Sequence, residues 1–136
     1  MILLDTSFLY ALNDASDRNH RAVVALLDTL NAPLALPTPV LPELCYLLHS
    51  RLGHHVMRRF LHGLIESDIH ILPLSADDMQ RIVELLEQYT DARLDFTDAG
   101  IVALAERHGI STIATFDHRD FSIVRPRHTV SFELLP

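Results

Sequence analysis

The chain opens with the stretch Met1–Ser7, MILLDTS, in which a wholly apolar run ends at an acid and two hydroxyls. A short apolar run without alternation is typical of a parallel strand that is covered on both faces. In open parallel sheets, ligands bind beyond the carboxyl ends of the strands, which is where Asp5 would lie. The sequence therefore predicts a buried strand that delivers the Asp5 carboxylate to the edge of a sheet. The alternative is that Asp5, Thr6 or Ser7 only caps the next helix.

The remaining sequence alternates between short apolar segments and segments with apolar residues at helical spacing. Further strands are expected at residues 34–36, 69–72, 111–115 and 129–133, the last as an edge strand, and a long loop is expected at 116–127. Helices are expected at 8–12, from Asp17 or Asn19 to 30, at 40–52, 54–66, from 76 to about 86 and at 97–108. This alternation predicts one domain over residues 1–136, a three-layer α/β/α sandwich around a mostly parallel sheet of about five strands.

Composition limits the classes of function. The chain has 136 residues and a formal net charge of −7, and all 11 basic residues are arginine. An acidic chain is not a general nucleic-acid-coating protein, because phosphate contacts come from Lys and Arg, but nucleic acid as a substrate is not excluded. The single Cys45 permits no disulfide within one chain, and the apolar start has no basic flank, so we expect a cytoplasmic protein without a membrane span.

Three further acids are placed where they could meet Asp5. Glu43 lies in the first turn of the helix after the second strand, at the rim of its apolar face, although it could simply interact with the helix dipole. Asp98 shares a helix face with Ile101 and Val102, and the alternative is a capping box with Asp95. Asp117 follows the fourth strand at the end that matches Asp5, and the alternative there is turn chemistry. Spacing does not exclude Asp95 or Asp120 from the same role.

If these acids converge, they repel one another. Two like charges about 5 Å apart at an effective dielectric constant of about 20 cost about 3 kcal/mol. Such a cluster persists only if a cation enters or some acids stay protonated. Because no Cys or paired His accompanies the acids, Mg²⁺ or Mn²⁺ suits the site better than zinc.

The same residues carry a family resemblance. The segments Leu4–Ser7, Pro42–Leu44, Phe96–Ala105 and Thr115–Phe121, in this order over nearly the whole chain, resemble the PIN-domain ribonucleases. The chain is most similar to the small, single-domain toxins of the VapC type, which act with a cognate antitoxin. Each motif is weak by itself, and the four together in order are specific.

The resemblance implies a magnesium- or manganese-dependent endoribonuclease, the toxin of a toxin–antitoxin pair. By this resemblance Asp5, Asp98 and Asp117 would hold the metal and Glu43 would be the helical acid. The hydroxyl residues Thr6, Ser7 and Thr115 would support the carboxylates. Gly100 stands where a bulkier or acidic residue is expected. The implied partners are RNA, with tRNA or ribosomal RNA as the expected substrate, a small antitoxin protein and a second copy of the chain.

Other classes fit less well. Phosphate-accepting receiver domains and haloacid-dehalogenase-type phosphatases require a lysine beside the active-site aspartate, and this chain has no lysine. A non-catalytic antitoxin-binding or scaffold module and an RNA-processing nuclease without an antitoxin both remain open. The candidate RNA contacts are arginines, namely Arg18, Arg21, Arg51, Arg58, Arg59, Arg119, Arg125 and Arg127, and the sequence favours none of them.

Overall fold

The structure, a computed structural model, describes all residues 1–136 as a five-stranded parallel sheet and seven helices. The strands are β1 (Ile2–Leu4), β2 (Leu34–Pro37), β3 (His70–Leu72), β4 (Thr112–Ala114) and β5 (Glu133–Leu135). The helices are α1 (Thr6–Asn13), α2 (His20–Leu27), α3 (Val40–Leu52), α4 (His54–Glu66), α5 (Ala76–Gln88), α6 (Phe96–His108) and α7 (His118–Ile123). The predicted three-layer α/β/α sandwich is confirmed.

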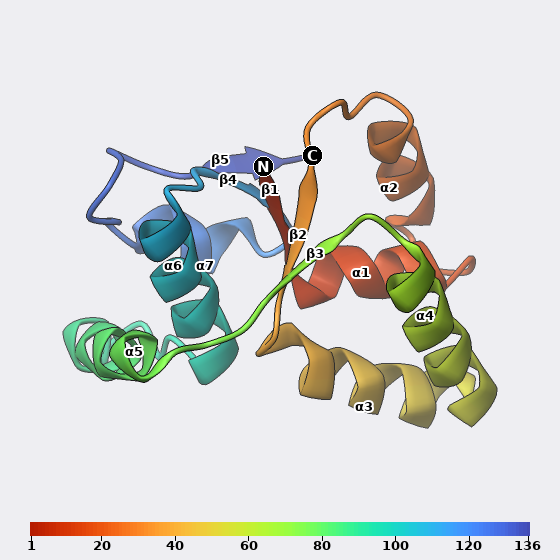
Figure 1. Cartoon of the computed structure of the whole chain (residues 1–136), viewed down its shortest axis with the longest axis horizontal. Coiled ribbons are helices and arrows are strands. Elements are labelled where there is room, and N and C mark those ends of the chain that lie inside the picture. Colours follow the sequence, from red (N-terminus) through yellow and green to blue (C-terminus); the bar gives the residue numbers. More distant parts are fainter.

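The strand order is β3-β2-β1-β4-β5, with every neighbouring pair parallel. From β1 the chain moves outward to β2 and β3, and it then returns to add β4 and β5 on the other side of β1. Because parallel crossovers are right-handed, the two directions of travel place their helices on opposite faces of the sheet. Figure 1 shows this arrangement, with α1 to α4 on one side of the sheet and α5 to α7 on the other.

The reversal between β1 and β4 is a topological switch point. Ile2, Leu3 and Leu4 of β1 pair with Thr112, Ile113 and Ala114 of β4. At such a point the loops that leave neighbouring strands diverge to opposite faces and open a crevice at the carboxyl edge of the sheet. The chain therefore has a crevice directly after Leu4 and Ala114, where Asp5 and Thr115 follow.

The core is continuous across the layers and consists of 31 buried apolar residues. All of β1 is buried, as expected for a strand covered on both faces. Helix α6 is buried along most of its length, from Asp98 to Ala105, because it lies against the sheet beneath α5. Gly109, in the left-handed conformation with φ 67°, ends it as predicted. The predicted capping box of Ser75 and Asp78 at the start of α5 is also present.

Two predictions near the C-terminus are wrong. The last strand was expected at residues 129–133, but β5 is Glu133–Leu135, because its register is fixed by pairing with Thr112–Ala114 rather than by the alternation before it. The expected loop at 116–127 contains helix α7, which forms because Phe121 is buried in the core. No helix has the length and apolar content needed to cross a membrane.

Candidate active site

A cleft of about 450 Å³ lies at the carboxyl edge of the sheet. The first turns of α1, α3 and α6 converge there, and Figure 1 shows the start of each of these helices near the lower end of β1 and β2. Its lining is rich in acids, namely Asp5, Asp17, Glu43, Asp95, Asp98 and Asp117. Thr6, Ser7, Tyr10, Arg18, Asn19, Leu47, Arg51 and Phe116 complete it. All four acids predicted from the sequence therefore line one cleft.

Asp5 lies at the centre of a hydrogen-bond network. Its carboxylate is buried, with 4% exposure, and its Oδ2 atom accepts hydrogen bonds from Thr115 Oγ1 at 2.7 Å and from Ser7 Oγ at 3.1 Å. Although Asp5 occupies the N-cap position of α1, it makes no side-chain capping bond. The capping alternative for Asp5 is therefore wrong. Both hydroxyls bind the same oxygen, which leaves Oδ1 free of side-chain donors.

The two hydroxyls are themselves held by backbone groups. Ser7 Oγ accepts from the N–H of Phe116 at 3.0 Å, and Thr115 Oγ1 accepts from the N–H of Asp117 at 2.9 Å. Each hydroxyl has one proton, and both protons point to Asp5, so the 3.3 Å contact between Ser7 and Thr115 carries no hydrogen bond of its own. The network fixes the ends of β1 and β4 to each other. Ser7 and Thr115 thus both hold the Asp5 carboxylate by hydrogen bonds.

Thr6 behaves differently from the other two predicted hydroxyl residues. Its side chain is buried in the wall of the cleft, and its Oγ1 atom has no hydrogen-bond partner. A buried hydroxyl without a partner is unfavourable. The Thr6 hydroxyl therefore makes no hydrogen bond with a carboxylate.

Asp98, like Asp5, is an acid with a raised pKa. Asp95 is the N-cap of α6, and its carboxylate accepts a hydrogen bond from the N–H of Asp98 at 2.9 Å. The helix is therefore capped by the side chain of Asp95 and not by that of Asp98. The Asp98 carboxylate is left free in the cleft, with 7% exposure. Burial, and then the negative charges of Asp95, Asp5, Asp117 and Asp120, raise the pKa of Asp98 to about 9.

Asp117 and Asp120 approach Asp98 from the start of α7, which lies on the same side of the sheet as α6. Carboxylate oxygens of Asp98, Asp117 and Asp120 lie within 4.8 Å of one another. Helix α7 explains this, because residues three apart on a helix share a face, and Asp117 makes no side-chain capping bond there. Burial and the neighbouring Asp117 raise the pKa of Asp120. From the sequence, Asp120 was only an alternative to Asp117 as the fourth acid. If residues 117–120 had been predicted as a helix and not as a turn, Asp120 would have been expected on the same face as Asp117.

Glu43 stands slightly apart from this group. It is exposed in the first turn of α3 and lines the cleft, while Leu44 and Leu48 on the same helix are buried. Its charge contributes to the raised pKa of Asp5, after the larger effect of burial. Glu43 is therefore within electrostatic reach of Asp5 but outside the close group of three carboxylates.

The absence of a side chain at Gly100 has a steric reason. A Cβ atom there would meet Pro39 Cγ at 2.9 Å, and Pro39 is the residue that precedes α3. The proline ring occupies the space into which a side chain at position 100 would extend. Glycine thus lets α6 approach the start of α3, which brings Asp98 and Glu43 to the same cleft.

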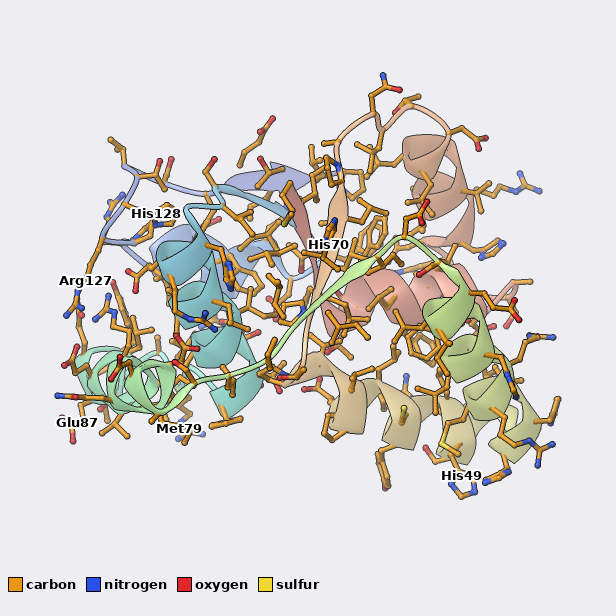
Figure 2. The ribbon with its side chains drawn as sticks, viewed as in Figure 1. His49, His70, Met79, Glu87, Arg127 and His128 are labelled. Carbon is orange, nitrogen blue, oxygen red and sulfur yellow. The ribbon has the colours of Figure 1, made fainter.

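The donor set of the cleft suits a hard divalent cation. The close group contains only carboxylate oxygens, which Mg²⁺ and Mn²⁺ prefer. No histidine belongs to it, and Figure 2 shows His49, His70 and His128 far apart on the molecule. Burial, and then neighbouring carboxylates, raise the pKa values of Asp5 and Asp98, and a bound cation would favour their ionised forms.

The fold and the cleft together define a class, namely doubly wound α/β domains with a carboxylate cluster for a divalent cation at the switch point. Sequence comparison gives the family. The profile of the PIN domain matches residues 2–125. The chain belongs to the PIN-domain family and is of the VapC ribonuclease type.

Two relatives from Mycobacterium tuberculosis match nearly the full chain. Ribonuclease VapC26 is 31% identical over 135 residues, which cover 99% of this chain and 100% of the relative. The 23S rRNA-specific endonuclease VapC20 is 29% identical over 122 residues, 90% of this chain and 92% of the relative. The similarity therefore extends well beyond the acid motifs.

Solved structures agree with this assignment. The crystal structure of M. tuberculosis VapC20, described as a sarcin–ricin-loop-cleaving toxin, superposes with a TM-score of 0.82 and 25% identity, over 88% of this chain and 92% of that one. A toxin–antitoxin complex from Klebsiella pneumoniae superposes with a TM-score of 0.70 and 26% identity, over 91% and 92% of the two chains.

Proposed function

We propose that this protein is a Mg²⁺- or Mn²⁺-dependent endoribonuclease that acts as the toxin of a type II toxin–antitoxin pair. The observation that carries the proposal is the convergence of Asp5, Asp98 and Asp117 in one cleft, where neighbouring negative charges raise the pKa of Asp98. A divalent cation bound there would neutralise the carboxylates and stabilise charge that develops on a phosphodiester.

The roles of the side chains follow from their contacts. Asp5 and Asp98 are the principal ligands in this proposal, since both are buried and both have raised pKa values. Asp117 completes the metal set, and Asp120 is close enough to join it. Glu43, exposed in the first turn of α3 and lining the same cleft, is the fourth catalytic acid of the proposal. Ser7 and Thr115 keep Asp5 oriented, and Thr6 forms part of the wall.

The proposed substrate is structured RNA, with ribosomal RNA as the first candidate. VapC20 is named as an endonuclease specific for 23S rRNA, and it superposes on most of this chain. Transfer RNA is the second candidate. The proposed partners are a small antitoxin protein, as in the Klebsiella complex, and a second copy of the chain. An antitoxin arginine among the acids would replace the cation, because a guanidinium binds carboxylates well.

Two alternatives predict different outcomes. A non-catalytic antitoxin-binding module would bind its partner but cleave nothing. An RNA-processing nuclease would cleave RNA, yet no antitoxin would inhibit it. Co-purification with the product of a neighbouring gene, followed by a cleavage assay with and without that product, separates these two from the toxin.

The direct test is cleavage of labelled ribosomal and transfer RNA fragments by purified protein with Mn²⁺, Mg²⁺ or EDTA. We expect cleavage only with a divalent cation. Asp98→Asn should reduce the rate by more than about a hundredfold, because loss of even an outer-shell partner of a metal commonly costs 10- to 100-fold. Asp77→Asn is the matched control, since Asp77 is exposed on α5 outside the cleft. Equal rates for wild type and Asp98→Asn would rule out this catalytic site.

A further inference from the structure

Two arginines share the cleft with the acids, and neither forms an ion pair. Of the basic side chains, Arg81, Arg107 and Arg127 make the four salt bridges in the structure. Arg18 and Arg51 line the cleft, are exposed, and have no carboxylate in ion-pair contact even though six acids line the same space. Their positive charge is therefore available to a ligand.

Arg51 has a defined place relative to the acids. Glu43, Leu47 and Arg51 follow one another at intervals of four residues on α3, and all three line the cleft. Residues at this interval share a face of a helix. Eight residues of helix span about 12 Å, so this face presents a carboxylate at one end and a guanidinium well beyond it.

The Arg51 guanidinium rests on an aromatic ring. Its Cζ atom lies 5.1 Å from the centroid of Tyr10, a residue of α1 that also lines the cleft. The Tyr10 hydroxyl donates a hydrogen bond to Asp14 Oδ2 at 2.9 Å, and the residue is 9% exposed. A cation–π contact with a fixed ring limits the freedom of the guanidinium but leaves the N–H groups in its plane able to donate.

Arg18 is held at the mouth of the same cleft by a turn. The N–H of Asn19 donates to Asp17 Oδ1 at 2.8 Å, and the N–H of His20 donates to the Asp17 carbonyl at 3.0 Å. These bonds fix the backbone on both sides of Arg18 just before α2. The two free cations of the cleft thus lie on the wall formed by α1, α3 and the turn before α2, which also carries Glu43 and Asp17. The acids Asp5, Asp98 and Asp117 lie just after β1 and β4 and at the start of α6.

This separation of charge fits an extended polyanion. Phosphates that approach the acids are repelled unless a cation intervenes, whereas phosphates further along the chain need positive side chains. The planar guanidinium matches the geometry of a phosphate with two parallel N–H donors. A single-stranded segment passing over the acids along α3 would reach Arg51 at a phosphate other than the one that is cleaved.

We propose that Arg51, held on the ring of Tyr10, binds a phosphodiester neighbouring the cleaved one in single-stranded RNA, and that Arg18 contacts the same backbone. This inference rests on the proposed function, since it takes RNA as the substrate. It selects two of the eight candidate arginines as substrate-binding residues and gives Tyr10 the role of positioning Arg51.

The test measures RNA binding separately from cleavage. Fluorescence anisotropy with a labelled single-stranded RNA is recorded for Asp98→Asn protein, which cannot cleave, between about 50 and 200 mM salt. Adding Arg51→Gln should lower the affinity about tenfold, and the slope of log K against log salt should become shallower by about 0.7, the value for one contact with single-stranded nucleic acid. Arg21→Gln, an exposed arginine of α2 outside the cleft, is the matched control and should change neither quantity.

Tyr10 variants separate positioning from folding. Tyr10→Phe keeps the ring but loses the hydroxyl bond to Asp14, so it should weaken RNA binding less than Tyr10→Leu does. Tyr10→Leu removes the ring and should weaken binding while Arg51 remains charged, with folding checked by thermal melting. In the cleaving background, Arg51→Gln should raise KM and leave both kcat and the Mn²⁺ dependence unchanged, because it removes binding outside the metal site.

Several outcomes would overturn this assignment. Equal salt slopes for Arg51→Gln and Arg21→Gln would do so, as would an Arg51→Gln variant with altered Mn²⁺ dependence, which would place Arg51 in the acid cluster. Unchanged RNA binding with weakened antitoxin binding would assign Arg51 to a protein partner instead. If wild type cleaves no RNA but Arg51→Gln still weakens RNA binding in the expected manner, the proposed nuclease function fails while the binding site stands.

Discussion

Thr115 Oγ1 donates a 2.7 Å hydrogen bond to Asp5 Oδ2, joining two buried side chains that are 110 positions apart in the chain. The bond connects the carboxyl ends of β1 and β4, the neighbouring strands of the switch point. Thr115 Oγ1 also accepts from the N–H of Asp117. One hydroxyl therefore orients Asp5 and fixes the start of the segment that carries Asp117.

Replacing Thr115 with valine should impair metal binding more than folding. Valine keeps the shape of the side chain but removes the donor to Asp5 and the acceptor for Asp117. Such outer partners of metal ligands are commonly worth 10- to 100-fold in affinity or activity. We therefore expect the Mn²⁺ concentration that gives half-maximal cleavage to rise by a factor in this range. Thr112→Val is the control, because the Thr112 hydroxyl, at the start of β4 and away from the cleft, bonds Glu133 Oε2 on the neighbouring strand β5. An equal loss there would contradict the prediction.

In EDTA, the protein should become less stable as the pH rises. The folded-state pKa of Asp98 is raised to about 9 from an ordinary value of 3.8, so the folded state binds more protons between these values. The destabilising effect of Asp98 is therefore absent below about pH 4, and the free energy of unfolding falls as the pH rises from there toward 9. Thermal melts of wild type and Asp98→Asn across this range measure the effect.

Asp98→Asn should flatten that pH profile. Above neutral pH in EDTA the variant should melt several degrees higher than wild type, since one carboxylate pair at about 5 Å costs about 3 kcal/mol. Adding Mn²⁺ should reverse the order, because binding to the folded state stabilises wild type by mass action. A wild-type melting temperature that is independent of pH in EDTA would show that the acids are not under repulsion.

Glu106→Gln should destabilise the packing of α5 on α6. Arg81 Nε and Nη2 donate to the two Glu106 oxygens at 2.7 and 3.0 Å, and the side chains are only 12% and 9% exposed. Neutralising one partner of a buried pair typically costs about 3 kcal/mol, because the other charge loses its compensation. Urea unfolding measures this loss.

The control for that pair is Glu84→Gln. Glu84 bonds Arg127 at 2.8 Å and lies 3.5 Å from Arg81 Nη1, a longer contact than the two that Arg81 makes with Glu106. Because the side chains of Glu84 and Arg127 are 43% and 65% exposed, the change should cost less than about 1 kcal/mol. Figure 2 shows Arg127 at the outer edge of the molecule, on the segment that follows α7. If Glu106→Gln and Glu84→Gln lowered the free energy of unfolding by similar amounts, burial would not be the reason why the Arg81–Glu106 pair matters more.

Gly100→Ala should destabilise the domain by about 1 to 3 kcal/mol, the usual cost of overpacking. The new methyl group would meet the Pro39 ring, whose Cγ atom is 2.9 Å from its position. Pro39→Ala removes that atom, so the double variant should lose less stability than the sum of the single variants. Gly63→Ala is the control, since nothing lies within 4 Å of its added Cβ, and it should stabilise α4 slightly. Additive losses for Gly100→Ala and Pro39→Ala would contradict the steric account.

The sequence predicted helices and strands well where the apolar periodicity and the residues that end an element indicate the same boundaries. The apolar run before Asp5, the helix from near Thr97 to His108 and its terminal Gly109 are all present. Asp98 was expected to face the interior, and it is buried. The reason is that residues three and four positions apart share a face of a helix, so Asp98 lies on the same face as Ile101 and Val102. Glu106 and Arg107 point away from the cleft, as expected, and bind Arg81 and Asp78.

The sequence failed where short segments depend on distant partners. Helix α7 has only six residues, too few for a periodic pattern, and it exists because Phe121 packs into the core. As a result Asp120 joins Asp98 and Asp117, which a turn at 117–120 did not predict. The start of β5 is likewise set by β4 and not by local alternation.

The sequence by itself determined the class of the fold, the order of the acids and their positions just after strands or in first turns of helices, because these depend on local periodicity. Only the tertiary structure decided which acids meet, which hydroxyls hold Asp5, and that Arg18 and Arg51 remain free in the same cleft. Those relationships depend on the direction of the crossovers at the switch point and on contacts between residues up to 110 positions apart, which no local pattern encodes.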